Sequence, residues 1–251
     1  MRYQFAITRE PGPTLDGCIS DHPLKKYLNI GLARKQHQDY CKALEELGIE
    51  LIRLPRDDRY PDGCFVEDTA VVYKRRAFIT RLALPSRWGE EEAVMQILKG
   101  KFLVIQAQPP ATIEGGDVIQ LENKLICGIT QRTTINGARQ LQEALRTPVI
   151  TLTNEEILHL KSHISYLGNN TMLVTEQFAN HPVLKDYQKL IVPKFEKYAA
   201  NALAVNGVVL MAKAFPKTQE IVREAGFEVW PIDTTEFEKC AGALTCLSIL
   251  F

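Results

Sequence analysis

The sequence predicts an α/β protein made of five repeated units, and three observations support this prediction. Short apolar strands recur five times along the chain, a helix-like stretch follows each of them, and a second strand follows most of the helices. The 251 residues are 45% hydrophobic and 24% charged, which is the composition of a folded globular protein. Five strand-helix-strand units of this kind suggest five small α/β blades in a radial arrangement.

The first strand of each unit is a short apolar run that stops at a polar residue. Runs of this length and composition, bounded by polar residues, are typical of buried strands. They lie at residues 4–9, 77–81, 125–130, 171–176 and 207–213.

The helix of each unit comes next, and the second strand follows it. Most of the helical stretches place apolar residues at helical spacing, and several end at glycine. The helices are predicted at residues 36–48, 90–100, 136–146, 183–191 and 218–226. The second strands are predicted at residues 49–55, 102–108, 148–153 and 227–232, with a short, charged and less regular segment at 191–198. Additional strands are predicted at residues 65–73 and 117–122.

An open doubly wound sheet is the alternative to a ring of blades. Short helices with short connections favour small blades, and no Gly-rich loop of the dinucleotide or phosphate-binding type opens any helix. In a ring, the polar residues at the inner strand ends would converge on one central cavity.

The charge balance favours a small-molecule partner. Lys plus Arg and Asp plus Glu both number 30, so no overall field attracts nucleic acid or an anionic membrane. The N-terminus has no signal-peptide core, and no stretch approaches the roughly 20 apolar residues of a membrane span. We expect a cytoplasmic protein whose residues 1–251 form a single domain, as a monomer or homodimer.

The six cysteines are scattered without CxxC pairs or a matching histidine spacing. This pattern argues against a disulfide scaffold and against a structural zinc site, and buried free thiols are the default expectation. The cysteines are Cys18, Cys41, Cys64, Cys127, Cys240 and Cys246.

Two adjacent acids, Glu67 and Asp68, interrupt residues 65–70, a run that otherwise has the pattern of a buried strand. In a strand, neighbouring side chains point to opposite faces, so water can solvate at most one of them. The other acid needs a cationic partner, which could be a bound ligand or a structural Arg or Lys.

Four stretches place reactive or charged groups beside apolar strands: 61–70, 113–121, 158–163 and 242–251. Taken singly, each stretch has an ordinary structural explanation. Asp62 could belong to a turn, and Glu114 could flank a tight Gly-Gly turn. His159 could be a buried core histidine, and Cys246 could be an unreactive buried thiol. Together they supply a nucleophile, a proton carrier, a group to orient that carrier, and acids for a cation. The set therefore suits a positively charged electrophile.

The motifs "FVEDTA", "EGGD", "HLKS" and "LTCLS", in this order, closely resemble the dimethylarginine dimethylaminohydrolase family of the guanidino-group modifying superfamily. The resemblance runs over nearly the whole chain, and it implies the five-bladed α/β propeller (pentein) fold of repeated ββαβ units.

The resemblance also implies roles for individual residues. Cys246 matches the nucleophile, His159 the general acid and base, and Glu114 the carboxylate that orients the histidine. The other matches are substrate contacts: the acids Asp62, Glu67 and Asp68, the apolar wall Phe65, the carboxylate-binding Arg87 and Arg132, and, at the α-amino end, the main chain of Leu15 and, more loosely, Cys240. Ala241 departs from the family pattern, which has an acid there.

The implied reaction is hydrolysis of asymmetric dimethylarginine or monomethylarginine to citrulline through a thiouronium intermediate on Cys246, with no metal or cofactor. A guanidinium is planar and matches a carboxylate, so we expect Asp68 to bind it face on, with the substrate as the counter-ion of this acid. Related arginine deiminases have an aspartate where this chain has Lys161, and losing that acid suits a methylated nitrogen, although Lys161 could equally be a solvated surface lysine.

Two other functions remain open at this stage. One is an arginine deiminase or another amidine hydrolase. The other is a non-enzymatic binding module, because the same propeller occurs in a ribosome subunit anti-association factor. We also expect the Pro- and Gly-rich segment 9–17 to be a flap over the cavity.

Overall fold

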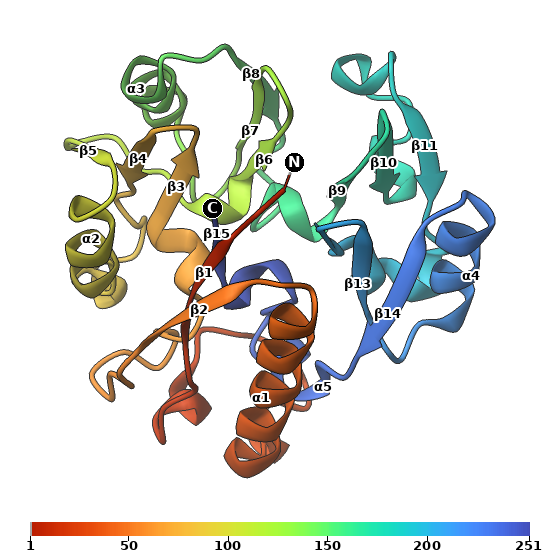
Figure 1. Ribbon diagram of the computed structural model, residues 1–251, viewed down its shortest axis with the longest axis horizontal. Coiled ribbons are helices and arrows are strands. Elements are labelled where there is room, and N and C mark those ends of the chain that lie inside the picture. The colour runs from red at the N-terminus through yellow and green to blue at the C-terminus, as the bar shows by residue number, and fades with distance from the viewer. Residues whose placement is uncertain (1) are drawn as a thin grey trace.

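Five separate three-stranded sheets surround a central axis in the computed structural model, which describes residues 2–251 (Figure 1). In each sheet the middle strand runs antiparallel to one neighbour and parallel to the other. This arrangement confirms the predicted five-bladed α/β propeller of ββαβ units. It also excludes the open doubly wound sheet, because within residues 2–251 no sheet continues from one blade into the next.

Each blade follows the same strand order. The blades are β15 (Ile249–Leu250), β1 (Phe5–Arg9) and β2 (Glu50–Leu54); β3 (Ala70–Tyr73), β4 (Arg76–Ile79) and β5 (Leu103–Gln106); β6 (Val118–Gln120), β7 (Leu125–Ile129) and β8 (Val149–Thr153); β9 (Ile164–Gly168), β10 (Thr171–Val174) and β11 (Gln188–Ile191); and β12 (Leu203–Val205), β13 (Val208–Ala212) and β14 (Glu228–Ile232).

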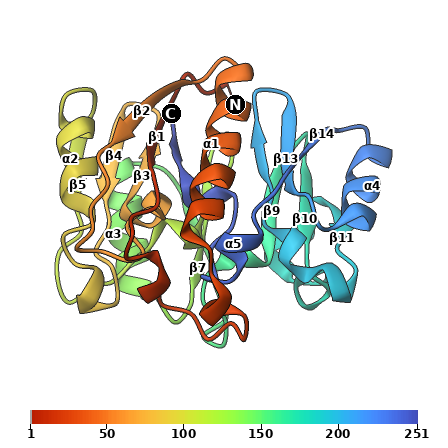
Figure 2. The ribbon, with the colours of Figure 1, turned by 90° about the horizontal axis from the view of Figure 1, so that it is seen from below.

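An α-helix connects the two parallel strands in four of the blades. These helices are α1 (Ile30–Glu46), α2 (Glu91–Lys99), α3 (Ile135–Leu145) and α4 (Pro216–Glu224). The side chains of Asn29 and Thr134 accept hydrogen bonds from the first turns of α1 and α3, as N-caps do. Figures 1 and 2 place α2 and α4 on opposite outer sides of the ring.

The fourth blade differs from the prediction, because residues 183–191 do not form a helix. A 3-10 turn at Pro182–Leu184 leads instead into strand β11, which pairs in parallel with β10. The predicted second strand at 191–198 is mostly the 3-10 segment Lys194–Ala200. The apolar spacing was compatible with a helix, but the backbone of β10 needs a strand partner, and this pairing overrides the local pattern.

The C-terminal strand closes the ring, because β15 pairs antiparallel with β1 through Ala6 with Leu250 and Ile7 with Ile249. The backbone of Phe251 also exchanges hydrogen bonds of 2.8 and 2.9 Å with Phe5. Closure brings the segment just before β15 to the centre of the molecule (Figure 1).

Short 3-10 helices precede the first strands of several blades, and they hold the four sequence motifs. They are η3 (Val66–Thr69) before β3, η5 (Gly115–Asp117) before β6, η6 (Leu160–Ser162) before β9 and η10 (Thr245–Leu247) before β15. The predicted strands at 65–73 and 117–122 therefore start later, at Ala70 and Val118. Glu67 and Asp68 lie on a tight turn and not on opposite faces of a strand.

Within residues 2–251, no helix combines the length and the apolar character needed to span a bilayer.

Candidate active site

One cavity collects most of the predicted site residues, and we call it the Cys246 cavity. The side chains come from loops of different blades, and ring closure brings them together. The cavity is lined by Ile19, Asp62, Phe65, Asp68, Arg87, Arg132, Leu158, His159, Cys240, Ala241, Gly242 and Cys246. Ile19, Leu158 and Gly242 were not predicted, since nothing in their local sequence distinguishes an apolar or small lining residue.

His159 is paired with a buried carboxylate. Its Nε2 lies 2.7 Å from Oε2 of Glu114, whose other oxygen accepts a hydrogen bond of 2.9 Å from the backbone N–H of Ala83. Burial favours the neutral imidazole, but Asp68 and Glu114 outweigh it and raise the pKa of His159 to about 9. His159 is therefore a cation at neutral pH.

The turn around His159 is fixed by the "EGGD" motif. Asp117 accepts a hydrogen bond of 2.8 Å from the backbone N–H of Leu160, next to His159. A Cβ atom at Gly116 would lie 2.9 Å both from the ring Cγ of His159 and from Oδ1 of Asp68. Only glycine allows this close approach of the η5 backbone to the two side chains.

Cys246 lies in η10, just before the closing strand, and its side chain is half-buried. Burial raises the pKa of its thiol well above the ordinary value, and the negative charges of Glu67 and Asp68 raise it further. At neutral pH the cavity therefore holds a protonated thiol and an imidazolium. A cation bound beside the sulfur would be needed to favour the thiolate.

Asp68 already has a cationic partner in the protein, so the expectation that the substrate is its counter-ion needs correction. Nη1 of Arg87 lies 3.0 Å from Oδ2 of Asp68, and both side chains are buried. The same guanidinium also donates hydrogen bonds of 3.0 and 2.8 Å to the two oxygens of Glu90. Together, the cations Arg87 and His159 face three carboxylates, those of Asp68, Glu90 and Glu114, so negative charges outnumber positive ones in this region.

Glu90 was missed by the sequence reasoning, although it lies three residues after Arg87 on the same turn, where the two side chains can meet. Burial raises the pKa of Glu90 to about 7, while Arg87 opposes the shift. Its two hydrogen bonds fix the plane of the Arg87 guanidinium.

Arg132 contrasts with Arg87. Its Nη1 is buried but has no hydrogen-bond partner among residues 2–251. Asp62 lies in the same region, where its two oxygens accept from the backbone N–H of Ile19 at 3.2 Å. Burial raises the pKa of Asp62, and the positive charges of Arg87 and Arg132 oppose that shift. This end of the cavity offers an unsatisfied donor and an acid close to each other.

Glu67 is not brought into the Cys246 cavity. It lines a neighbouring cavity, where its oxygens bind Nζ of Lys161 at 2.6 Å and the hydroxyl of Thr245 at 2.8 Å. The predicted contact of Glu67 with the substrate therefore lacks structural support, because Lys161 is its partner. Lys161 is correspondingly not a solvated surface lysine.

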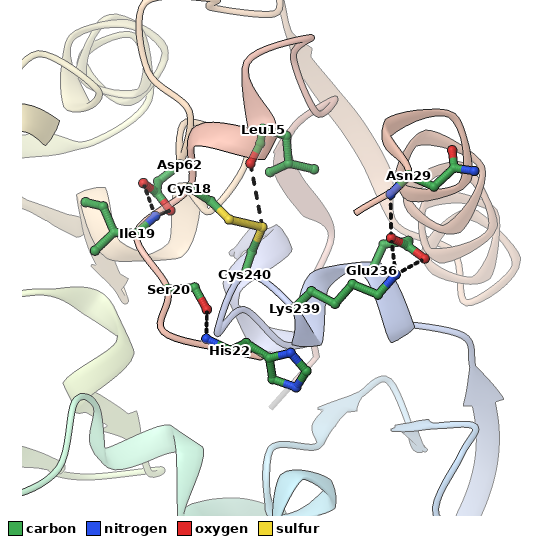
Figure 3. The surroundings of a disulfide bond; sticks show 10 residues. All are labelled: Leu15, Cys18, Ile19, Ser20, His22, Asn29, Asp62, Glu236, Lys239 and Cys240. Atoms are coloured by element: carbon green, nitrogen blue, oxygen red, sulfur yellow. Dashed lines mark hydrogen bonds and ion pairs between the residues drawn. A yellow bond between two sulfur atoms is a disulfide. The ribbon is translucent and has the colours of Figure 1, made fainter. Parts of the chain in front are cut away.

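Cys240 lines the Cys246 cavity as predicted, but it is not a free thiol. It forms a disulfide with Cys18, as Figure 3 shows, so the expectation of six free cysteines is wrong for this pair. The two residues are 222 positions apart, and only ring closure brings them together. Cys41, Cys64 and Cys127 are buried free thiols, as expected.

Leu15, predicted to contact the substrate through its main chain, is buried beside this disulfide and does not line the cavity. Its carbonyl accepts a hydrogen bond of 3.0 Å from the backbone N–H of Cys18 and lies 3.7 Å from the sulfur of Cys240.

Three residues could together hold a cation, because ligand atoms of Asp68, Glu114 and His159 lie within 4.8 Å of one another. Nη1 of Arg87 already sits among them, at 3.0 Å from Asp68 and 3.9 Å from Glu114. A positive charge therefore occupies this position, which makes the group a poor fit to a resident metal.

Sequence comparisons identify full-length relatives. A family model described as arginine deiminase matches residues 58–192. The N(G),N(G)-dimethylarginine dimethylaminohydrolase of Pseudomonas aeruginosa is 35% identical, covering 99% of this chain and 100% of the relative. The enzyme of the same name from Streptomyces coelicolor is 34% identical, covering 97% of this chain and 95% of the relative.

A comparison with solved structures agrees with the sequence comparison. A mutant of the Pseudomonas aeruginosa enzyme complexed with citrulline superimposes with a TM-score of 0.96 at 32% identity, covering 100% of both chains. The chain belongs to the dimethylarginine dimethylaminohydrolase family, within the amidinotransferase and arginine deiminase superfamily.

Proposed function

We propose that this protein hydrolyses Nω-methylated arginines, namely asymmetric dimethylarginine and monomethylarginine, to citrulline and a methylamine. The observation that carries the proposal is that Cys246, His159 and Arg132, whose Nη1 has no partner among residues 2–251, line one acid-rich cavity. Residues 1–251 act as a single catalytic domain in the cytoplasm, and the mechanism uses side chains alone.

The two ends of the substrate have opposite charges, and the cavity has a counterpart for each. The carboxylate of the amino acid binds Arg132, whose Nη1 lacks a partner within the described chain, and Arg87 contributes a second positive charge. The guanidinium binds on the side of Asp68, where three carboxylates face the two cations Arg87 and His159. Phe65 supplies an apolar surface for the methylene chain.

Binding of the substrate's cation activates the nucleophile. The pKa of the Cys246 thiol is raised in the empty cavity, and a guanidinium beside the sulfur offsets the nearby negative charges. The thiol releases its proton to water, and the thiolate attacks the guanidino carbon to form a tetrahedral adduct. His159, cationic because of its raised pKa, donates a proton to the methylated nitrogen, which leaves as the free amine.

Hydrolysis of the covalent intermediate completes the cycle. The loss of the amine leaves a thiouronium on Cys246 and a neutral His159. The imidazole then takes a proton from water, which attacks the same carbon, and the carbon–sulfur bond breaks to give citrulline and Cys246. Glu114 holds the ring through Nε2, which leaves Nδ1 for proton transfer.

The environment of Lys161 supports methylated arginine, and not arginine, as the preferred substrate. Its ammonium is held by Glu67 at 2.6 Å, so the position that carries an acid in arginine deiminases carries no free carboxylate here. A dimethylated nitrogen offers no N–H, and an unpaired buried carboxylate would cost about 1 to 3 kcal/mol.

The proposal is tested by measuring citrulline formation from asymmetric dimethylarginine, monomethylarginine and arginine side by side. We expect the methylated substrates to have the higher kcat/KM, and a preference for arginine would favour the deiminase alternative. Cys246→Ser should lower kcat by about a thousandfold or more. Unchanged turnover in this variant would exclude Cys246 as the nucleophile.

A further inference from the structure

The Cys18–Cys240 disulfide forms part of one wall of the Cys246 cavity. Cys240 lines the cavity itself, and Cys18 directly precedes Ile19, which also lines it. The backbone N–H of Ile19 in turn binds the carboxylate of Asp62 (Figure 3). The disulfide thus fixes a continuous wall of Cys240, Ile19 and Asp62.

The segment on the Cys18 side has no regular secondary structure, so side-chain packing, hydrogen bonds and the disulfide hold it in place. Residues 10–29, between β1 and α1, contain two short 3-10 turns but neither an α-helix nor a strand. The side chain of Leu15 is buried in the core, and hydrogen bonds join Nε of Arg34 to the carbonyl of Pro11 at 3.0 Å and Nζ of Lys239 to the carbonyl of Tyr27 at 3.1 Å. We call residues 10–29 the flap, a longer segment than the residues 9–17 predicted from the sequence, and the disulfide is its covalent attachment to the far end of the chain.

The segment on the Cys240 side leads to the nucleophile. Residues 241–245 join Cys240 to Cys246, and Ala241 and Gly242 in this connection also line the cavity. Ala241 has a left-handed backbone (φ 55°), so the chain turns sharply directly after the disulfide. The disulfide therefore joins the flap to the loop that carries Cys246.

We infer that the Cys18–Cys240 disulfide is a redox-sensitive positioning element for the amino-acid end of the substrate site. In the oxidised protein it holds Ile19 and Asp62 beside Arg132, so the charged end of the substrate meets a fixed wall. Reduction releases the flap and raises KM. This inference rests on the proposed function for the identity of the substrate.

A dithiol compound can reduce the Cys18–Cys240 disulfide to two thiols. One thiolate of the reductant attacks a sulfur of the disulfide and forms a mixed disulfide, which the second thiol resolves. The protein gains two electrons and two protons as two thiols, and the dithiol becomes a cyclic disulfide. Disulfides in a reducing cytoplasm are usually transient, catalytic or redox-sensing, and one at the wall of a catalytic cavity suits such a role.

Reduction also changes the chemistry at Leu15. A disulfide sulfur carries no hydrogen, so the 3.7 Å approach of the Cys240 sulfur gives the Leu15 carbonyl no donor. The reduced Cys240 thiol could donate to that oxygen. The carbonyl, which already accepts from Cys18, would then lose its remaining capacity to accept from another group.

The experiment compares the air-oxidised wild-type protein with the same protein after dithiothreitol treatment, using non-reducing peptide mass mapping to establish the redox state. We expect reduction to raise KM for asymmetric dimethylarginine at least threefold and to change kcat less than twofold. Cys18→Ser should have the raised KM with or without dithiothreitol. Cys127→Ser, which removes a buried free thiol outside the cavity, should respond as the wild type does.

Limited trypsin digestion provides a readout that needs no substrate. Lys25 and Lys26 lie within the flap, so reduction should accelerate cleavage after them at least fivefold in the wild type and in Cys127→Ser. If no methylated arginine is hydrolysed in either redox state, the proposed function fails. The trypsin cleavage rates then test by themselves whether the disulfide holds the flap in place. Equal cleavage rates in the two states, or an unchanged KM in protein shown to be reduced, would overturn the inference. So would the absence of the Cys18–Cys240 peptide from oxidised protein.

Discussion

Nε2 of His159 lies 2.7 Å from Oε2 of Glu114, and this carboxylate is fully buried. The pair fixes the imidazole ring and, together with Asp68, keeps it cationic in a site whose burial would otherwise favour the neutral form. The ring is thus ready to act as an acid before any substrate binds.

Glu114→Gln is expected to lower kcat by about a hundred- to ten-thousandfold, since proton transfer needs both the charge and the orientation of the ring. It should also lower the pKa of His159 below its value of about 9, because a supporting negative charge is lost. The pH dependence of kcat checks this, and its alkaline limb should move to lower pH. An alkaline limb at the wild-type position would show that Glu114 does not support the charge of His159.

Arg132 and Arg87 should respond oppositely to truncation. Arg132→Ala removes a guanidinium nitrogen that has no partner in the described chain, so stability should be unchanged or slightly higher. If Arg132 binds the carboxylate of the substrate, KM should rise about tenfold to a hundredfold. This increase corresponds to the loss of one hydrogen bond to a charged group.

Arg87→Ala serves as the comparison. It leaves Glu90 buried without its cation and Asp68 with His159 as its remaining cation, and the free energy of unfolding should fall by about 3 to 5 kcal/mol. Urea unfolding and initial-rate kinetics on both variants separate the two roles. Equal losses of stability would contradict the distinction.

Lys161 and Glu67 should behave as one unit, because the ion pair at 2.6 Å is mostly buried. Lys161→Met leaves the buried carboxylate of Glu67 without its cationic partner and should lower the free energy of unfolding by about 3 to 5 kcal/mol. Adding Glu67→Gln should recover most of this loss. A double-mutant cycle of unfolding free energies measures the coupling, and additive effects would show that the pair is not coupled.

The fold was largely predictable from the sequence because its signals are local. Apolar runs and helical spacing lie within each blade, and the five units repeat them. The prediction failed at 183–191, where apolar spacing suited a helix but β10 required a strand partner. It also failed at Glu67 and Asp68, because a 3-10 turn before a strand has the same composition as the strand itself.

The candidate site was predictable only as a set of motifs. Sequence pattern indicated which residues carry chemistry, and their assigned roles remain predictions. The partners Arg87 for Asp68 and Lys161 for Glu67 could not be predicted, since ring closure decides which cation meets which acid. The Cys18–Cys240 disulfide was missed for the same reason.

The pH dependence of stability should follow the shifted pKa values of the cavity. The pKa of His159 is raised from 6.5 to about 9, so its stabilising contribution is complete below pH 6.5 and is lost as the pH rises through 9. The pKa of Glu90 is raised from 4.5 to about 7, so its contribution is complete below pH 4.5 and is lost as the pH rises through 7. Asp68 acts in the opposite direction, because its pKa is lowered and its contribution is lost only in strong acid.

We therefore expect the free energy of unfolding to decrease from pH 6 to pH 9.5, and urea denaturation at half-unit intervals measures the slope. In His159→Asn the part of the decrease centred between pH 6.5 and 9 should disappear, while the part due to Glu90 stays, because that carboxylate is buried against Arg87 in both proteins. A wild-type stability that rises over this interval would mean that His159 is neutral in the folded protein. The imidazolium proposed as the acid for amine departure would then be absent from the resting cavity.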